Sequence, residues 1–259
     1  MECEERKIAA VVGALVADAA AQPLHWNYDI NKLNSILGDK KEIAFWEPSS
    51  NPFYCIPTGS QSCYGDQSFV ILKSLVDNDG LNVKHLQKST FETFGANTVY
   101  DDTDNQAYTS KTDVKKKVFP IKASWRNSSI KIFLQKYEQG LEDTGCDKDV
   151  QMDCVLRIIP VVALYAGKPD MLDKAEDVIR VTQNSDTSVA VGLAAARILE
   201  QYILYGNKSD VLESVIEELG NPKRTNPQDL DKALAGQLRE VLNSKELDHR
   251  TAAKKFRID

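Results

Sequence analysis

The chain has 259 residues and a formal net charge of −6 at pH 7; 42% of its residues are hydrophobic and 27% are charged. These values are ordinary for a globular domain, and they exclude a collagen-like chain, a long disordered chain and a bundle of membrane-spanning helices. Binding to nucleic acid relies on clustered Lys and Arg, so the acidic balance predicts no nucleic-acid partner.

The cysteines and histidines show no pattern of a disulfide framework or a zinc site. The five cysteines are odd in number and form no CxxC pair, and the three histidines are far apart in the sequence. Disulfide frameworks have an even number of cysteines, and structural zinc needs closely spaced Cys or His pairs. We therefore expect reduced thiols and a cytoplasmic or nuclear location.

An apolar run near the N-terminus, residues 8–17, resembles the core of a signal peptide. Glu2, Glu4 and Glu5 precede it, whereas a signal peptide begins with a positively charged segment. Asp18 also interrupts the apolar region. The sequence therefore predicts a buried helix here, and no apolar stretch of the roughly 18 residues that a membrane span needs. We expect no membrane partner.

Hydrophobic residues recur with helical spacing along most of the chain. The segment 189–204 is apolar almost all round, which predicts a helix at the centre of the domain. No segment shows the strict alternation of a strand. The prediction is a compact all-α fold of many helices around a buried central helix, in a single domain over residues 1–259. The predicted helical stripes are 8–19, 69–76, 172–179, 189–204, 212–219 and 230–241.

Two stretches lack helical spacing. Residues 43–65 contain three prolines and five aromatic residues, and an ordered loop of this length often builds a functional site. Residues 98–123 are polar and charged, and we expect them to be exposed. Pro160 lies within a further apolar segment, where it starts or kinks a helix.

Asp18 is the first candidate for chemistry, because it lies on the same predicted helix face as Val11 and Leu15. A buried carboxylate must be paired, hydrogen-bonded, metal-bound or protonated. Two interpretations remain open. Asp18 either caps backbone N–H groups of a neighbouring loop or belongs to a site.

The residues that follow the first helix are the second candidate. Pro23 ends the helix and places His25 and Trp26 at its exit. His25 is either a structural hydrogen-bonding residue or a base. Trp26 either packs in the core or stacks on a planar ligand.

Polar clusters precede two of the predicted helices. Residues 60–68 open the second stripe, and Asp66 suits its N-cap, although the same place suits a cation or an anion. Residues 184–187 predict the N-cap of the central helix. Residues 101–104 are acidic but lack the Gly and the distal Glu of a calcium loop, so we expect an exposed turn.

Several of these motifs together resemble a known family. Residues 13–20 (GALVADAA), with Gln22 and Pro23, resemble the opening helix of ADP-ribosylglycohydrolases, which often reads G-x-x-x-G-D-A-x-G-x-P. The J-crystallin branch of that family is more similar still, and the likeness covers essentially the whole chain. Its matching segments are residues 22–26, 51–59, 63–67, 125–127 and 184–187.

The resemblance implies a compact all-α domain with two Mg²⁺ ions in a cleft, and hydrolysis of the N- or O-glycosidic bond that links ADP-ribose to a protein or small molecule. The family holds its metals with T-D-D-T at the start of a helix and D-x-D-T near the C-terminus. Asp66 and Asp18 are then the candidate catalytic residues, and Asp66 is the candidate metal ligand. The residues expected at the ligand are Trp26, His25, Ser62, Tyr64, Gly65 and Gln67.

The chain departs from the family in three places. Residues 64–67 (YGDQ) stand where the first metal cluster is expected, so only Asp66 remains there as a ligand. The region after the first helix offers His25 and Trp26 where active relatives often have a Glu. Asp259 comes before the helices that would carry the second metal cluster.

These departures predict a catalytically weak or inactive family member that is structural or binds ADP-ribose or a related nucleotide. Too few carboxylates remain to hold two Mg²⁺ ions, so Lewis-acid activation of water is expected to fail. The alternative is an active Mg²⁺-dependent hydrolase of ADP-ribosyl bonds. If the family's last helices normally cover this core, their absence also predicts self-association.

Overall fold

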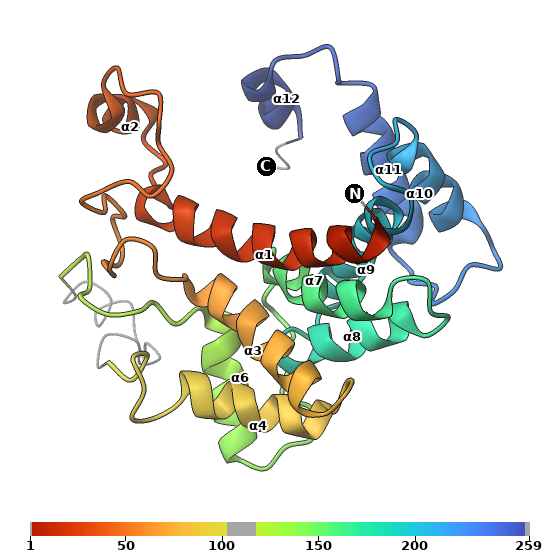
Figure 1. Ribbon diagram of the computed structural model, residues 1–259, viewed down its shortest axis with the longest axis horizontal. Coiled ribbons are helices and arrows are strands. Elements are labelled where there is room, and N and C mark those ends of the chain that lie inside the picture. The colour runs from red at the N-terminus through yellow and green to blue at the C-terminus, as the bar shows by residue number, and fades with distance from the viewer. Residues whose placement is uncertain (1, 103–117, 257–259) are drawn as a thin grey trace.

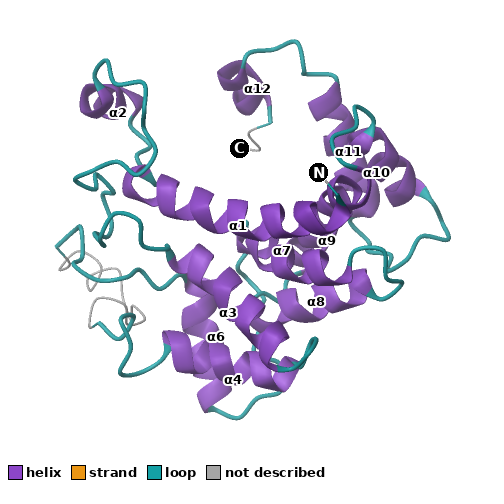
Figure 2. Ribbon diagram, viewed as in Figure 1, coloured by secondary structure: helices purple, strands orange, loops and turns teal. Residues whose placement is uncertain are grey.

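A computed structural model describes residues 2–102 and 118–256 of the chain. Within these ranges the regular structure is helical, and β-pairing is limited to two isolated bridges. The predicted all-α fold is therefore confirmed (Figures 1 and 2). The elements are α1 (Cys3–Ala21), η1 (Gln22–Leu24), α2 (Ile30–Leu37), α3 (Cys63–Asp77), α4 (Val83–Phe94), α6 (Ser128–Glu138), α7 (Asp153–Tyr165), α8 (Met171–Thr182), α9 (Asp186–Tyr205), α10 (Val211–Gly220), α11 (Asp231–Leu242) and α12 (His249–Lys255).

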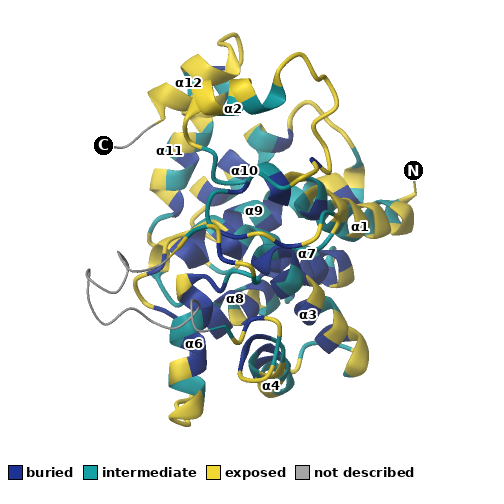
Figure 3. Cartoon of the chain, turned by 90° about the vertical axis from the view of Figure 1, so that its left-hand side faces the viewer, coloured by how far each residue is buried: buried dark blue, intermediate teal, exposed yellow. Residues whose placement is uncertain are grey.

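The centre of the domain is formed by α7 and α9, which pack against each other and against α1 and α8. Helix α9 also contacts α10 and α11, and its Val189, Leu193 and Ala196 are fully buried. Figure 3 shows these buried segments in the middle of the molecule. The prediction of a buried central helix over residues 189–204 is confirmed. Pro160 lies inside α7.

Serine side chains cap the two helices whose starts were predicted. Ser185 accepts a hydrogen bond from the backbone N–H of Ser188 and caps α9, as the polar cluster at 184–187 predicts. Ser62 caps α3 by accepting from the N–H of Tyr64. The prediction that Asp66 is this N-cap is wrong, because Asp66 lies one turn inside the helix, where its own N–H bonds to the carbonyl of Ser62.

Helix α1 is not the buried helix that its sequence predicts. Ala19 is its one fully buried residue within the described part of the chain, while Ile8 is 65% exposed and Val12 is 52% exposed. The reason is that α3, α7 and α9 pack against one side of α1, and Figure 1 shows the opposite side without a helix packed on it. Arg6 fixes its N-terminal end by donating from Nε to the carbonyl of Ile203 at 2.6 Å.

The segment Cys3–Leu24 is long and apolar enough to cross a membrane, judged by length and composition. The prediction that no such stretch exists is therefore wrong. An uninterrupted apolar run ends at Asp18, but the mean hydropathy of an 18-residue window tolerates a few charges. Within the domain, this segment packs against α3, α7 and α9.

The long loop before α3 is held by a short bridge to the segment after residue 117. Cys55 donates its N–H to the carbonyl of Ile121 at 2.8 Å, and Ile121 donates to Phe53 at 2.9 Å. Tyr54 and Ile121 are buried there in a small cluster that also includes Trp26. Thr103 and Asp104 of the acidic stretch lie outside the described residues.

Candidate functional site

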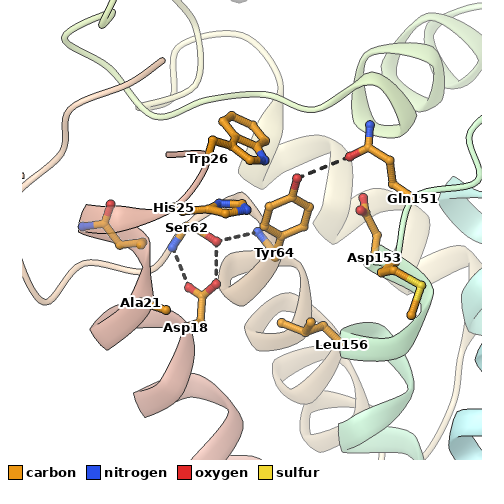
Figure 4. A pocket seen from close by; sticks show the side chains of 11 residues that line it. Asp18, Ala21, His25, Trp26, Ser62, Tyr64, Gln151, Asp153 and Leu156 are labelled. Atoms are coloured by element: carbon orange, nitrogen blue, oxygen red, sulfur yellow. Dashed lines mark hydrogen bonds between the residues drawn. The ribbon is translucent and has the colours of Figure 1, made fainter. Parts of the chain in front are cut away.

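A pocket of about 460 Å³ lies where the end of α1, the start of α3 and the start of α7 meet (Figure 4). The end of one helix and the starts of two others bring together residues that are distant in sequence. Helix starts also offer backbone N–H groups that have no partner within the helix. The polar residues in the lining are Asp18, Gln22, His25, Ser62, Tyr64, Gln151 and Asp153.

Asp18 caps the start of α3. Its Oδ2 accepts from the backbone N–H of Ser62 at 2.7 Å, and its Oδ1 accepts from Ser62 Oγ at 2.5 Å (Figure 4). Burial raises the pKa of the Asp18 carboxyl, and the hydrogen bonds from Ser62 oppose that shift. The structure thus gives Asp18 the capping role that was one of its two interpretations, at the edge of a pocket.

Gly65 allows this close approach of α1 and α3. A Cβ at position 65 would overlap Asp18 Oδ2 and Gln61 Oε1. A larger residue here, including an Asp, would have to displace the Asp18 carboxylate. The absence of a side chain at position 65 is therefore what leaves space for Asp18 to cap α3.

Aromatic rings form one wall of the pocket. The rings of His25 and Trp26 lie 4.7 Å apart, and His25 meets Tyr64 edge-on at 5.8 Å. Burial lowers the pKa of His25, which favours the neutral imidazole. Trp26 has a left-handed backbone, with a φ of 64°, and its ring packs edge-on against Phe53 and Trp125. Non-glycine residues rarely adopt this conformation outside positions fixed by their surroundings.

Two buried polar residues of the lining were not predicted as site residues. Gln22 and Asp153 are each 2% exposed. Within the described part of the chain, neither amide atom of Gln22 has a hydrogen-bond partner, and neither does Oδ1 of Asp153. Each has a sequence signal: Gln22 follows the first helix directly before Pro23, and Asp153 opens an apolar segment with Arg157 one turn later.

Asp153 is held from behind by a buried polar network. Its Oδ2 accepts hydrogen bonds from Asn127 Nδ2 and from Ser129 Oγ. Burial raises its pKa, and the nearby Arg157 opposes that shift. Arg157 in turn donates to Gln183, whose amide donates to the carbonyl of Gln151 at 3.0 Å. The network therefore fixes both the carboxyl and the backbone at the start of α7.

Asp66 and Gln67 do not line this pocket. Asp66 Oδ2 accepts from the hydroxyl of Tyr100 at 2.5 Å, and burial raises the pKa of its carboxyl. Gln67 is buried on the core side of α3, where its amide approaches the sulfur of Cys63. The structure thus brings together Asp18, Ser62, Tyr64, His25 and Trp26, with Gly65 beneath them.

The residues present do not fit a Mg²⁺ centre. Among the described residues, no group of three or more His, Cys, Asp or Glu side chains is arranged to hold a metal ion. Mg²⁺ requires near-octahedral oxygen ligation, whereas both oxygens of Asp18 accept from Ser62 and Asp66 accepts from Tyr100.

Comparisons with known proteins cover most of the chain and point to one family. A family model described as ADP-ribosylglycohydrolase matches residues 1–256. Crystallin J1A of Tripedalia cystophora is 36% identical over 215 residues, which is 83% of this chain and 63% of that protein. Crystallin J1B of the same organism is 36% identical over 220 residues, which is 85% of this chain and 65% of that protein. The matched region thus spans less than two thirds of either relative.

A solved structure supports the fold. A chain described as an ADP-ribosylglycohydrolase-related protein complex superposes with a TM-score of 0.55 at 14% identity, covering 94% of this chain and 77% of that one. At this identity the match shows a shared all-α architecture and no more.

Proposed function

Because the chain belongs to the ADP-ribosylglycohydrolase family and is similar to its J-crystallins, we propose that it binds ADP-ribose or a related nucleotide. We propose also that it cleaves glycosidic bonds weakly or not at all. The ligand site is the pocket between α1, α3 and α7. The pocket supplies a wall of aromatic rings and several polar side chains, which are the usual features of a small-molecule site.

The observation that carries the proposal is the use of Asp18 as a helix cap. Each carboxylate oxygen of Asp18 accepts a hydrogen bond from Ser62, and a side chain larger than Gly at position 65 would overlap Asp18 Oδ2 and Gln61 Oε1 and displace them. A metal-dependent hydrolase needs carboxylates that face the metal and its bound water. Here the side chain best placed at the pocket stabilises the start of α3 instead.

A metal-free mechanism has weak support for the same reason. Glycosidic hydrolysis without a metal uses two carboxyl groups on opposite sides of the scissile bond. Asp18 and Asp153 both line the pocket, but each is tied to protein donors, Asp18 to Ser62 and Asp153 to Asn127 and Ser129. We therefore expect the protein to bind its ligand but to hydrolyse glycosidic bonds slowly or not at all.

Thermal unfolding with ADP-ribose, with and without Mg²⁺, tests the proposal. A ligand at about 100 times its Kd stabilises the folded state by about 2.7 kcal/mol, which raises Tm by roughly 5–10 °C for a chain of this size. We expect the same rise with EDTA as with Mg²⁺, and no ADP-ribose released from a mono-ADP-ribosylated protein. A rise that requires Mg²⁺, together with release of ADP-ribose, would instead support an active hydrolase.

A further inference from the structure

Two neighbouring helices expose rows of apolar side chains. On α1, Ile8, Val12 and Val16 are spaced by one turn, and each is at least half exposed. On α3, which packs against α1, Phe69 and Val76 are spaced by two turns on one face and are also at least half exposed. Exposed hydrophobic residues are normally scattered singly over the surface of a monomer. Rows of them on adjacent helices therefore indicate an interaction surface.

The two rows meet at an apolar groove of about 520 Å³ near the N-terminal end of α1. Ile8 and Val12 line it from α1, Val76 lines it from α3, and Leu164 lines it from α7. The groove thus joins the rows of α1 and α3 into one apolar surface.

Both rows extend from the groove in the same direction. Asp18 near the end of α1 binds Ser62 just before α3, whereas the C-terminal half of α3 lines the groove with the N-terminal half of α1. The two helices therefore run antiparallel, and Val16 and Phe69 both lie on the side of the groove nearer the C-terminal end of α1. We call the whole surface the α1–α3 face, and its members are Ile8, Val12, Val16, Phe69, Val76 and Leu164.

The α1–α3 face has the size of the core of a small protein–protein interface. A half-exposed side chain of this kind presents roughly 50 Å² of apolar surface, so the six together present on the order of 300 Å². An apolar patch of about this size or larger is often functional. A standard interface takes about 800 Å² from each partner and surrounds an apolar core with a polar rim. The face supplies such a core at the small end of the range, which predicts a weak association.

The shape of the face suits contact with an identical face. A two-fold symmetric contact buries the same patch on both copies, so the patch must carry both a projection and a hollow. The row of side chains on α1 is a ridge, and the groove beside it is a hollow. Ala9, Gly13 and Ala17 are exposed next to this ridge, and such small residues allow a second helix to approach the backbone of α1 closely.

Two ion pairs balance most of the charge beside the face. Glu4 pairs with Lys7 at 2.7 Å, and Lys73 pairs with Asp77 at 2.5 Å. Two copies that meet at this face therefore experience little repulsion between like charges. A strongly acidic or strongly basic partner would gain little attraction from the same neutral pairs. The charge distribution thus favours a second copy as the partner.

We propose that the α1–α3 face is the contact between two copies of this chain, which form a weak, two-fold symmetric dimer. This inference is independent of the proposed function, because the face and the pocket at the other end of α1 are lined by different residues. Interfaces of standard size reach Kd values from micromolar to picomolar, so for this smaller one we expect a Kd on the order of 10–100 µM.

Sedimentation equilibrium of the purified chain over a concentration series tests the dimer. At about 1 µM we expect the monomer mass of 28.9 kDa, and above about 200 µM a mass approaching twice that value. A mass that stays at 28.9 kDa throughout the series would overturn the proposal. A mass that continues to rise beyond two copies would also overturn it, because a face that pairs with itself closes the assembly at two.

Two variants test whether the contact is made by this face. Val12→Lys and Val76→Lys place a charge on its α1 side and its α3 side, and we expect each to raise the dimer Kd at least tenfold, because burial of an unpaired charge is costly. Both positions are at least half exposed in the single copy, so the Tm measured at about 1 µM, where the chain is monomeric, should stay close to that of the wild type.

The matched control is Val241→Lys in α11. Val241 is also an exposed helical valine, but it does not line the groove, so this variant should keep the wild-type dimer Kd. If the wild type dimerises and both Val12→Lys and Val76→Lys keep its Kd, the contact lies elsewhere on the molecule and the proposal is wrong.

Discussion

Two hollows of similar volume lie against α1, one at each end of the helix. The pocket at its C-terminal end, between α1, α3 and α7, measures about 460 Å³, and an apolar groove near its N-terminal end measures about 520 Å³. The groove is lined mainly by aliphatic side chains of α1, α3 and α7, including Val12, Val76 and Leu164. Two of its three charged residues, Glu4 and Lys7, pair with each other. The pocket is instead lined by aromatic rings and by polar side chains such as Asp18 and Ser62. The two hollows therefore differ in the chemistry of their linings and not in their volumes.

Among the variants that test the difference between the two ends of α1, we expect loss of the Asp18 cap to have the largest effect on stability. Asp18→Ala removes two hydrogen bonds to a charged group and leaves the Ser62 N–H unmatched. We expect the free energy of unfolding to fall by about 3 kcal/mol and Tm by roughly 6–12 °C, measured by urea and thermal denaturation. Asp29→Ala, which removes an exposed cap of α2, should cost about 1 kcal/mol. Equal losses would mean that burial adds nothing to the Asp18 cap.

A pair of glycine substitutions compares the crowded and the open side of α1. Gly65→Ala places a methyl group against Asp18 and Gln61, and overpacking of this kind costs about 1–3 kcal/mol. Gly13→Ala, on the exposed face of α1, meets no atom within 4 Å, so it should stabilise the helix by about 0.5–1 kcal/mol. Denaturant titration of both variants measures the difference. A stable Gly65→Ala protein would show that the Asp18 carboxylate moves aside easily.

The pH dependence of stability gives a smaller effect with a definite sign. Burial raises the pKa of Asp66 above its ordinary value of 3.8, although Tyr100 opposes that shift. The folded state therefore favours the protonated carboxyl, and the associated stability is present below that value and is lost as pH rises through the folded pKa. As pH rises through the folded pKa of Asp66, the free energy of unfolding should fall less for Asp66→Asn than for the wild type. Urea titrations at a series of pH values measure this difference.

The exposed Asp248 provides the control of opposite sign. Hydrogen bonds from Thr251 lower its pKa, so its contribution is present at higher pH and is lost as pH falls through the folded pKa. Asp248→Asn should therefore flatten the acid side of the profile. Identical profiles for Asp66→Asn and the wild type would show that the pKa of Asp66 is not raised in solution.

The sequence predicts the helices whose apolar stripes are long, and it misses helices that bury polar residues. Stripes at 172–179, 189–204 and 212–219 lie within α8, α9 and α10. Helix α4 was not predicted, because its buried face includes Gln87 and Thr90, whose partners belong to other segments or to the helix backbone. For α1 the prediction of a helix is confirmed, but the prediction that it is buried is wrong. Hydrophobic spacing does not tell how many neighbours pack around a helix.

The site was predicted in part for a similar reason. The motifs around Asp18, His25 and Tyr64 were found, because the chain is polar or aromatic there against an apolar background. Asp153 was missed, because its role depends on Asn127, which caps α6, on Ser129 in its first turn and on the position of α7 beside α3. Which carboxylate is a cap and which has an unpaired oxygen is a property of packing, and sequence spacing does not contain it.

The smallest expected effect tests the apolar groove. Val12 is half exposed and lines the groove, so Val12→Lys should change the free energy of unfolding by no more than about 0.5 kcal/mol, as surface substitutions usually do. It should also leave the Kd for ADP-ribose unchanged, because the pocket that we propose for this ligand lies at the other end of α1. Chemical denaturation and calorimetry on this one variant measure both quantities. If the free energy of unfolding fell as much as for Asp18→Ala, Val12 would be buried in solution. The N-terminal end of α1 would then be as closely packed as its C-terminal end.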